Sequence, residues 1–349
     1  MGAGFAAKLV AWQKRHGRHD LPWQGTRDPY AIWVAEIMLQ QTQVATVIPY
    51  YVRFCQHFPD VPALATAPLD EVLRLWSGLG YYSRARNLHR GAEIIVREHG
   101  GRFPARFEEV AALPGVGRST AAAICVFAHG ARHAILDGNV KRVLARRFGI
   151  AGYPADKRVA DRLWRQAERM LPRRDVEAYT QGLMDLGATV CTRARPKCAA
   201  CPVRGDCVAV KRGWVAKLPS RKARAPLPHK RTTLLALTCA GEVLLEKRPV
   251  SGIWGGMWCL PEAVPKTDIA TFCLKRFGAH VREVKKLRTI AHGFTHFKLD
   301  IRPLHVHVSA LVPHAAEPGR VWLSLEEARQ AAIPAPVKRI LAQLHAGDQ

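Results

Sequence analysis

The segment LPGVGRSTAAAICVFAHGARHAILDGNVKRV, residues 113–143, decides the fold that we predict for this chain. Pro114 ends a short amphipathic helix, and Gly115 and Gly117 are the residue type that accepts the positive φ values of a sharp turn. The alanine-rich run from Arg118 to Ala128 then resumes helix. The segment therefore predicts a helix, a tight turn and a second helix.

This turn has two interpretations. It leaves backbone N–H groups at the N-terminus of the second helix, where a phosphate can bind. A GxG turn is a weak signal, however, and ordinary packing of two helices explains it equally well. Asp137 follows the apolar pair Ile135 and Leu136 and precedes a helix predicted from Gly138 to Phe148. An Asp at such a position is usually an N-cap.

A second carboxyl group lies within the helix predicted from Tyr30 to about Val47. The residues around Glu36 are apolar on every face of this helix, so we expect the helix to be largely buried. Burial disfavours a charged carboxylate and raises its pKa, which suits a general acid. Glu36 is therefore a candidate catalytic acid, whereas the same residue on a surface helix would only be solvated.

Four of the nine cysteines form one group, with the spacing Cys191-x6-Cys198-x2-Cys201-x5-Cys207. Four thiols this close together, in a chain without an export signal, indicate a metal centre and not a disulfide framework. Structural zinc sites generally use paired C-x2-C knuckles, and this segment contains one.

The charge balance points to a polyanionic partner. The chain of 349 residues has 53 Lys and Arg against 28 Asp and Glu, a formal net charge of +25. This favours nucleic acid before an anionic membrane. No uncharged run is apolar enough to span a bilayer, and the N-terminus lacks a signal-peptide core. We therefore expect a cytoplasmic protein, associated with the nucleoid and not with a membrane.

These motifs together resemble a known family. LPGVGRSTA followed by LDGNVKRV resembles the helix-hairpin-helix and catalytic aspartate of base-excision DNA glycosylases. Ser119 stands where strand-cleaving relatives carry Lys, and in this respect the segment resembles the MutY adenine glycosylase family. The segment WVAEIMLQQTQVATVIPYY, residues 33–51, resembles the helix that carries the catalytic glutamate in that family. The resemblance covers nearly the whole chain, with the motifs in the family's order.

The resemblance implies a monofunctional glycosylase that removes adenine mispaired with 8-oxoguanine or guanine in double-stranded DNA. Glu36 is then the general acid, which protonates adenine, and Asp137 stabilises the sugar cation. Asp137 lies at a predicted helix N-terminus, which favours its ionised form. The cysteine spacing implies one 4Fe-4S cluster, with the ligands Cys191, Cys198, Cys201 and Cys207. We expect the enzyme to be a monomer.

The same resemblance implies a set of DNA contacts. The hairpin turn holds a phosphate, two residues form a wedge at the mispair, and arginines of the cysteine loop reach the DNA backbone. The residues implied are Gly115, Val116, Gly117 and Ser119 in the turn, Gln41 and Tyr81 in the wedge, and Arg193 and Arg195 in the loop.

The last third of the chain changes to β character. Residues 234–249 predict two strands around Ala240 and Gly241, and residues 324–327 form a capping box before a helix. This layout resembles the Nudix-like C-terminal domain of MutY, in which a loop similar to residues 292–297 reads 8-oxoguanine. The implied lesion-recognition residues are Phe294, Thr295 and His296. Residues 269–280 contain no acidic residue, so we do not expect Nudix hydrolysis.

We therefore predict a multidomain protein, with an all-α helix-hairpin-helix glycosylase region followed by an α+β Nudix-like domain. The glycosylase region covers residues 1–215: a six-helix barrel module at about 21–133, and a 4Fe-4S module formed by 1–20 plus 134–215. Residues 216–230 form a basic linker that contains proline, and the Nudix-like domain covers residues 231–345.

Two other functions remain open. An endonuclease III-like bifunctional glycosylase and lyase for oxidised pyrimidines would share the hairpin and the cysteines. Ser119 disfavours it because a hydroxyl cannot form a Schiff base, and so does the C-terminal domain. A non-catalytic iron–sulfur DNA-binding regulator would have no use for a buried acid such as Glu36.

Overall fold

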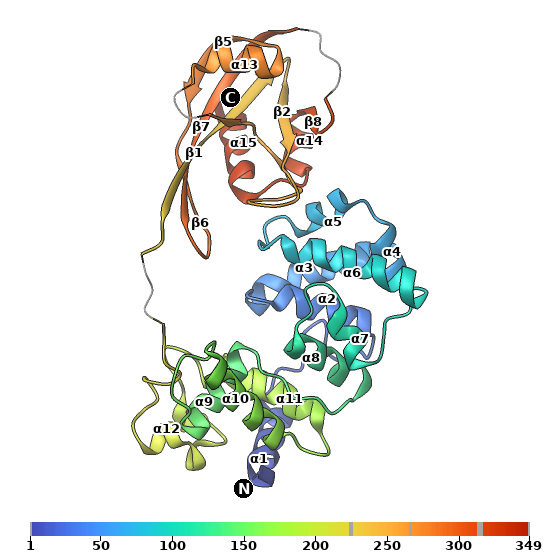
Figure 1. Ribbon diagram of the computed structural model, residues 1–349, viewed down its shortest axis with the longest axis vertical. Coiled ribbons are helices and arrows are strands. Elements are labelled where there is room, and N and C mark those ends of the chain that lie inside the picture. The colour runs from blue at the N-terminus through green and yellow to red at the C-terminus, as the bar shows by residue number, and fades with distance from the viewer. Residues whose placement is uncertain (1, 223–225, 265–266, 313–316, 348–349) are drawn as a thin grey trace. The chain divides into compact units, whose positions relative to one another are not determined.

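The computed structural model describes residues 2–222, 226–264, 267–312 and 317–347 and divides into two compact units (Figure 1). Unit 1 comprises Met1–Thr66 and Asn87–Arg224, and unit 2 comprises Ala67–Arg86 and Ala225–Gln349. The predicted linker includes residues 223–225, which lie outside the described residues. The domain boundaries that we expect from the sequence stay a prediction.

Unit 1 is helical. Its elements are α1 (Gly2–His16), α2 (Pro29–Leu39), α3 (Val44–His57), α4 (Val61–Thr66), α7 (Phe107–Ala112), α8 (Arg118–His129), α9 (Gly138–Phe148), α10 (Lys157–Met170), α11 (Val176–Asp185) and α12 (Val208–Lys211). Helix α6 (Ser83–His99) begins in unit 2 and continues into unit 1, and the short turns η1 (Leu186–Val190), η2 (Cys198–Ala200) and η3 (Arg204–Asp206) surround the cysteines. Among the described residues, no helix has both the length and the apolar character needed to cross a membrane.

The helix predicted from Tyr30 to about Val47 is in fact two helices. Helix α2 begins after Asp28, whose carboxylate accepts hydrogen bonds from the N–H groups of Tyr30 and Ala31, and ends at Leu39. Gln41 follows with a φ of 59°, a left-handed conformation through which an α-helix cannot continue. The prediction of burial is confirmed, since most residues of α2 are buried.

The hairpin has the predicted order of helix, turn and helix, but its two glycines differ. Gly115 has a φ of 77°, as predicted. Gly117 has a φ of −90° and a ψ of 169°, so the positive φ predicted for it is wrong. Gly117 is the N-cap of α8, a position that requires extended backbone. Gly117 has no side chain, so the backbone N–H groups in the first turn of α8 stay uncovered.

A buried ion pair holds the segment that precedes α2 against α11. Asp185 is fully buried and accepts hydrogen bonds from the backbone N–H of Arg18 at 2.9 Å and from its Nε at 2.7 Å. The side chain of Gln181 donates to the same carboxylate at 2.9 Å. A buried charge is tolerated only when it is paired and hydrogen-bonded in this way, so Asp185 fixes both Arg18 and Gln181.

In its described residues, unit 2 is built on a mixed sheet of eight strands, in which β3-β2-β1-β7-β5 are adjacent. The strands are β1 (His229–Cys239), β2 (Glu242–Lys247), β3 (Trp258–Cys259), β4 (Glu262–Ala263), β5 (Ala279–Lys286), β6 (Ile290–Gly293), β7 (Lys298–Leu311) and β8 (Arg320–Ser324). The helices are α5 (Leu69–Trp76), α13 (Ile269–Phe277), α14 (Leu325–Gln330) and α15 (Ala335–Gly347). Strands β1 and β7 run parallel, and the other pairs are antiparallel.

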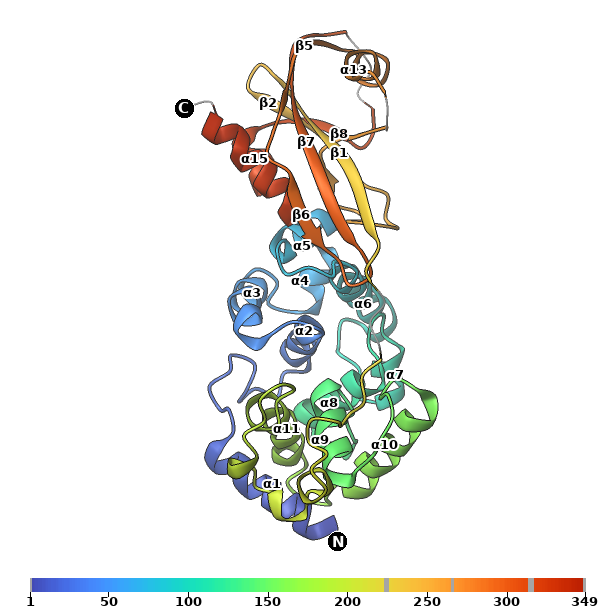
Figure 2. The ribbon, with the colours of Figure 1, turned by 90° about the vertical axis from the view of Figure 1, so that its left-hand side faces the viewer.

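Figure 2 shows α13 and α15 on opposite sides of this sheet. Cys273 and Phe277 of α13 pack against Leu235 and Val306 of the central strands. The predicted strand pair around Ala240 and Gly241 is confirmed as β1 and β2. The predicted capping box is also confirmed, because Ser324 and Glu327 exchange hydrogen bonds at the start of α14.

Candidate functional site

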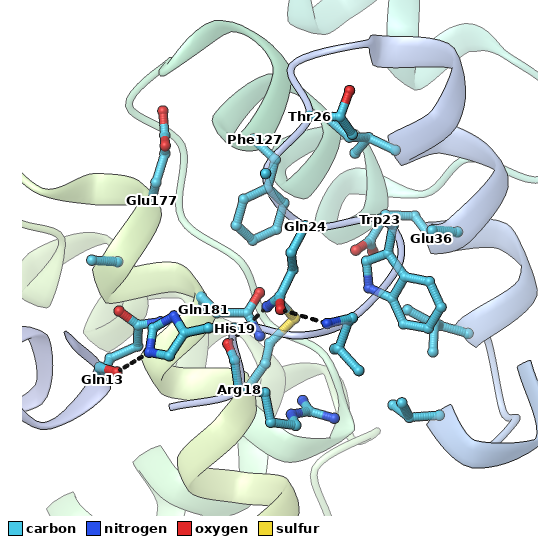
Figure 3. A pocket seen from close by; sticks show the side chains of 18 of the residues that line it. Gln13, Arg18, His19, Trp23, Gln24, Thr26, Glu36, Phe127, Glu177 and Gln181 are labelled. Carbon is cyan, nitrogen blue, oxygen red and sulfur yellow. Dashed lines mark hydrogen bonds between the residues drawn. The ribbon is translucent and has the colours of Figure 1, made fainter. Parts of the chain in front are cut away.

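Glu36 lines a cavity of about 470 Å³ in unit 1 (Figure 3). Helices α2, α8 and α11 and the turn before α2 form its walls. The side chains labelled around Glu36 in Figure 3 are Gln13, Arg18, His19, Trp23, Gln24, Thr26, Phe127, Glu177 and Gln181. Two aromatic rings and several amides around one cavity suit a planar molecule that carries hydrogen-bonding groups.

Hydrogen bonds fix the polar part of this cavity. The side chain of Gln24 accepts from the N–H of Leu21 at 3.2 Å and donates to the carbonyl oxygen of Arg18 at 3.0 Å. The Arg18 and Gln181 side chains are held by Asp185, as described above. The cavity is therefore organised before any ligand enters it.

The electrostatic state of Glu36 follows from its surroundings. Burial, followed by the nearby negative charge of Asp137, raises the pKa of Glu36 to about 8. The carboxyl group therefore holds its proton at neutral pH, which agrees with the acid expected from the apolar helix.

Asp137 is the N-cap of α9, as the sequence predicts. Its carboxylate accepts a hydrogen bond from the N–H of Val140 at 2.7 Å. Burial raises the pKa of Asp137, whereas the N–H groups of Val140 and Asn139 and the charges of Arg142 and Lys141 lower it. The helix N-terminus thus favours the ionised form, as expected, but the net shift is upward because desolvation outweighs the cap.

The fold brings the two carboxyl groups, which are far apart in the sequence, into electrostatic contact. Asp137 lines a second and wider cavity of about 1060 Å³, and Leu39 lines this cavity as well as that of Glu36. We call the second cavity the basic groove, because its lining includes Lys141, Arg142, Arg146, Arg193, Arg221 and Lys222. The acid and the aspartate thus belong to two neighbouring cavities that share one wall.

The hairpin lies beside this pair. The N–H of Leu136 donates to the hydroxyl of Ser119 at 2.9 Å, which holds the residue before Asp137 against α8. Gln40 donates through its side chain to the carbonyl oxygen of Gly115 at 3.1 Å. The N–H of Val116 is already bonded to the carbonyl oxygen of Leu113, so it is not available to a ligand. Gly117 provides no side-chain cap for α8, whose first N–H groups suit an anion.

The four cysteines of the predicted motif line one cavity of about 30 Å³. Arg146 and Arg147 line it as well, and Nη1 of Arg146 lies 3.4 Å from the sulfur of Cys191. Within the described residues, no three His, Cys, Asp or Glu side chains lie close enough together to hold a metal ion between them. The donor set itself fits a thiolate-bound cluster, because four soft ligands share a cavity whose cations offset negative charge.

The two predicted wedge residues share an unusual backbone conformation. Gln41 has a φ of 59° and Tyr81 a φ of 49°. Residues other than glycine seldom adopt this region, and such strain concentrates at functional sites. Gln41 lines the basic groove, and the side chain of Tyr81 is 45% exposed although it is large and aromatic. Each residue is therefore presented outward by its backbone.

Unit 2 contains a contact that no local sequence pattern indicates. The hydroxyl oxygens of Tyr81 and Thr295 lie 3.1 Å apart. Thr295 and His296 are exposed at the turn between β6 and β7, and Phe294 stacks on Phe297 with ring centroids 4.4 Å apart. Aromatic packing thus holds a short loop whose tip presents a hydroxyl group.

Sequence reasoning missed the residues that complete the cavity of Glu36, namely Arg18, Trp23 and Gln181. Trp23 lies in a turn, where no periodic pattern marks a functional side chain. Gln181 lies one helical turn before Asp185, and a buried acid with a polar residue at that spacing is the one local signal that could have indicated it. The predicted Arg193 lines the basic groove, and Arg195 is exposed on the same loop.

Comparison with known proteins decides the family. The model of the HhH-GPD superfamily of base excision DNA repair proteins matches residues 34–169, and that of the NUDIX domain matches residues 232–343. The adenine DNA glycosylase of Buchnera aphidicola subsp. Acyrthosiphon pisum is 36% identical over 339 residues, which cover 97% of this chain and 96% of that protein. This chain belongs to the adenine DNA glycosylase family. The Homo sapiens adenine DNA glycosylase is 33% identical over 408 residues, covering 99% of this chain and 74% of that one.

Solved structures agree with this assignment for the helical part. A thermostable thymine-DNA glycosylase superposes with a TM-score of 0.55 and 31% identity, covering 60% of this chain and 95% of that one. An endonuclease III in a non-covalent DNA complex gives a TM-score of 0.52 at 22% identity, covering 61% of this chain and 98% of that one, which shows a shared fold. The predicted family and fold class are confirmed, and the protein is a glycosylase of base excision repair that hydrolyses N-glycosyl bonds.

The raised pKa of Glu36 predicts how stability depends on pH. The folded protein holds this proton up to a pKa of about 8, whereas the unfolded chain releases it near the ordinary value of 4.5. The wild type therefore loses stability as pH rises through this window, and Glu36→Gln does not. The stability of Glu36→Gln relative to the wild type should increase between pH 5 and pH 8, by at most about 4 kcal/mol.

Urea unfolding at several pH values measures this difference. Glu98→Gln is the surface control, since it removes a carboxyl group whose side chain is 54% exposed on α6. A Glu36→Gln curve that runs parallel to the wild type over the whole window would contradict the raised pKa.

Proposed function

We propose that this enzyme removes adenine mispaired with 8-oxoguanine or guanine in double-stranded DNA, with Glu36 as general acid and Asp137 stabilising the oxocarbenium ion. One observation carries the proposal: a carboxyl group with a pKa of about 8 lines a cavity next to a second carboxyl group in a basic groove. We also expect a cytoplasmic monomer that acts on the nucleoid.

The first step concerns the base. Adenine must leave the stack to be reached, and the cavity of Glu36 is the place for it. Trp23 and Phe127 offer aromatic surface to the purine ring, and Gln181 offers an amide to its edge. Glu36 donates its proton to N7, so the electron pair of the breaking N-glycosidic bond moves into a neutral leaving base.

The second step concerns the sugar. Loss of the base leaves positive charge on C1′ and the ring oxygen, as in glycoside hydrolysis. Asp137 as a carboxylate stabilises this charge directly or bonds to C1′ for a time, and both routes remain open. Water then forms the new bond to C1′ and gives up one proton, which a carboxylate accepts. The products are free adenine and an abasic site.

We expect the DNA strand to stay intact after adenine leaves. Strand cleavage by a lyase requires an amine that forms a Schiff base with C1′. Ser119, which stands where strand-cleaving relatives carry Lys, has a hydroxyl that already accepts from Leu136. Lys141 lines the basic groove and is the amine that could crosslink occasionally.

We also propose that one 4Fe-4S cluster binds at Cys191, Cys198, Cys201 and Cys207. The shared cavity of these residues and the adjacent arginines support this choice. When bound, the cluster supplies a rigid anchor for the loop that carries Arg193 and Arg195. These exposed arginines then meet DNA phosphate from a fixed position.

The third part of the proposal is lesion reading by unit 2. In 8-oxoguanine, N7 bears a hydrogen, whereas in guanine it is an acceptor. Thr295 has a hydroxyl that can accept this N7–H, and Tyr81 lies within hydrogen-bond distance of it. Phe294 and His296 flank the hydroxyl. Because the hydroxyl of Tyr81 is near enough to donate to that of Thr295, the pair can be set in the accepting orientation.

Single-turnover base release tests the central proposal. Duplexes that carry A:8-oxoG, A:G or thymine glycol are incubated with wild type, Glu36→Gln and Asp137→Asn. We expect release of adenine from the first two duplexes only, and an abasic strand that breaks only after alkali treatment. Each variant should lower the rate at least about 100-fold while DNA affinity changes by only a few-fold.

Near-normal release by Glu36→Gln would remove the acid assignment. A wild-type rate for Asp137→Asn would leave Asp137 as a helix cap only. Strand scission at the rate of base release, without alkali, would contradict the monofunctional mechanism, and release from thymine glycol would favour the endonuclease III-like alternative.

Replacement of Thr295 tests lesion reading. Thr295→Ala should lower the preference for A:8-oxoG over A:G by roughly 10- to 100-fold, since one good base contact contributes about 1–3 kcal/mol of discrimination. Thr295→Ser is the matched control, because it keeps the hydroxyl and should keep the preference. The ratio of the two single-turnover rates is the measurement. If Thr295→Ala slows both substrates equally, or neither, Thr295 is not the reader.

Metal analysis tests the cluster. The purified protein should contain about four irons per chain and little zinc. Cys198→Ser should lose iron, solubility and DNA affinity, because the basic loop loses its anchor. Cys239→Ser, which replaces a thiol of unit 2, is the control and should keep its iron. One zinc and no iron in the wild type would refute the cluster.

A further inference from the structure

The segment from Leu218 to Lys222, which its composition identifies as linker, is an ordered wall of the basic groove. Residues Leu218, Pro219, Ser220, Arg221 and Lys222 all line that groove, together with Asp137. The whole groove lies within unit 1. A segment that only connected two domains would have no reason to share a cavity with the candidate catalytic aspartate.

Two anchors fix this segment. Leu218 is 4% exposed and packs with Cys207 and Ala209, and its carbonyl oxygen accepts from Nε of Arg146 at 2.9 Å. Two residues later, the hydroxyl of Ser220 accepts from the N–H of Gly152 at 3.2 Å. Arg221 and Lys222 follow the second anchor directly and are exposed, so unit 1 holds the backbone from which their side chains extend into the groove.

The same arginine connects this wall to the cysteine loop. Arg146 is 4% exposed, and its guanidinium donates to the carbonyl oxygens of Leu218, Thr192 and Arg193. One buried cation thus holds the two sides of the groove together. Charge-assisted hydrogen bonds of this kind are the strong ones, and their geometry is rigid.

The cations that line the groove fall into two groups. Arg142 and Arg146 donate to backbone carbonyl oxygens around Cys191. The other four, which are Lys141, Arg193, Arg221 and Lys222, form no ion pair with any acidic side chain in the part of the chain that the structure describes. Asp137 is the single acidic residue among the described residues that line the groove. Four cations without acidic partners around one carboxylate suit an extended polyanion.

We propose that Arg221 and Lys222 bind backbone phosphates of the DNA strand that carries the excised adenine. The proposal rests on the proposed function, because Asp137 marks where the sugar of that strand lies. The groove then holds this strand between Lys141 and Arg193 on one side and residues 218–222 on the other. Phosphate contacts position a strand without reading sequence, so these residues act on every duplex alike.

Salt-dependent DNA binding by the full-length protein tests this assignment. Each phosphate contact contributes about 0.9 to the slope of log affinity against log salt. The double variant Arg221→Ala/Lys222→Ala should therefore bind several-fold more weakly, with a slope smaller by about 2, to mispaired and matched duplexes alike.

Lys211→Ala/Lys217→Ala is the matched control. It removes the same charge from the neighbouring sequence, but neither lysine lines the groove. Its slope should change by clearly less than 2. Equal slope changes in both double variants would overturn the proposal, since net charge alone would then explain binding. An unchanged slope in Arg221→Ala/Lys222→Ala would overturn it as well.

Neutral methylphosphonate linkages identify the strand. Placed beside the adenine, they should remove most of the difference between wild type and Arg221→Ala/Lys222→Ala, whereas the same linkages on the opposite strand should preserve it. The reverse pattern would contradict the strand assignment. Failure of the proposed function is seen in a different measurement. If the wild type binds every duplex but releases no adenine, the proposed function fails, and the comparison of DNA binding still tests Arg221 and Lys222.

Discussion

The hydrogen bond from the N–H of Val140 to Asp137 starts helix α9, and the rest of unit 1 depends on that helix. Arg142 and Arg146 lie one turn apart on α9, and both donate to the carbonyl oxygen of Cys191. The candidate aspartate, the anchor of the cysteine loop and a wall of the basic groove are therefore consequences of a single helix. A shift of the N-cap of α9 would move the aspartate, the cysteine-loop anchor and the groove wall together. The geometry of the site therefore depends on one capping residue.

Burial raises the pKa of both carboxyl groups, and charges and hydrogen bonds oppose this rise only at Asp137. Glu36 has no cation among the causes of its shift, and its pKa rises to about 8. Asp137 is also raised, but cap hydrogen bonds and the charges of Arg142 and Lys141 oppose the rise. Two neighbouring carboxyl groups cannot both be ionised without mutual repulsion. The proton therefore stays on Glu36, the group that lacks this compensation, and the division into acid and carboxylate follows from the surroundings of each.

The sequence predicted those features whose cause is local. Helix α9 has the predicted bounds because Asp137 and the apolar spacing lie next to each other in the chain, and the acid in α2 follows from its apolar neighbours. The break at Gln41 was missed, and the neighbouring Gln40 is bonded to Gly115 of the hairpin, which is distant in the sequence. The pairing of Tyr81 with Thr295 spans 214 positions in the sequence. Geometry of that kind depends on the assembled fold, which no local pattern encodes.

The segment from Leu218 to Lys222 shows that composition, too, cannot predict contacts which depend on the assembled fold. A basic, proline-containing stretch without apolar periodicity predicts a linker, because such a stretch cannot bury enough surface to order itself. In this segment, one buried leucine and two hydrogen bonds are enough to order the backbone. Their partners are already rigid, so only a few residues lose conformational entropy. The order of residues 218–222 in the basic groove thus comes from the neighbouring residues of unit 1 and not from the composition of the segment.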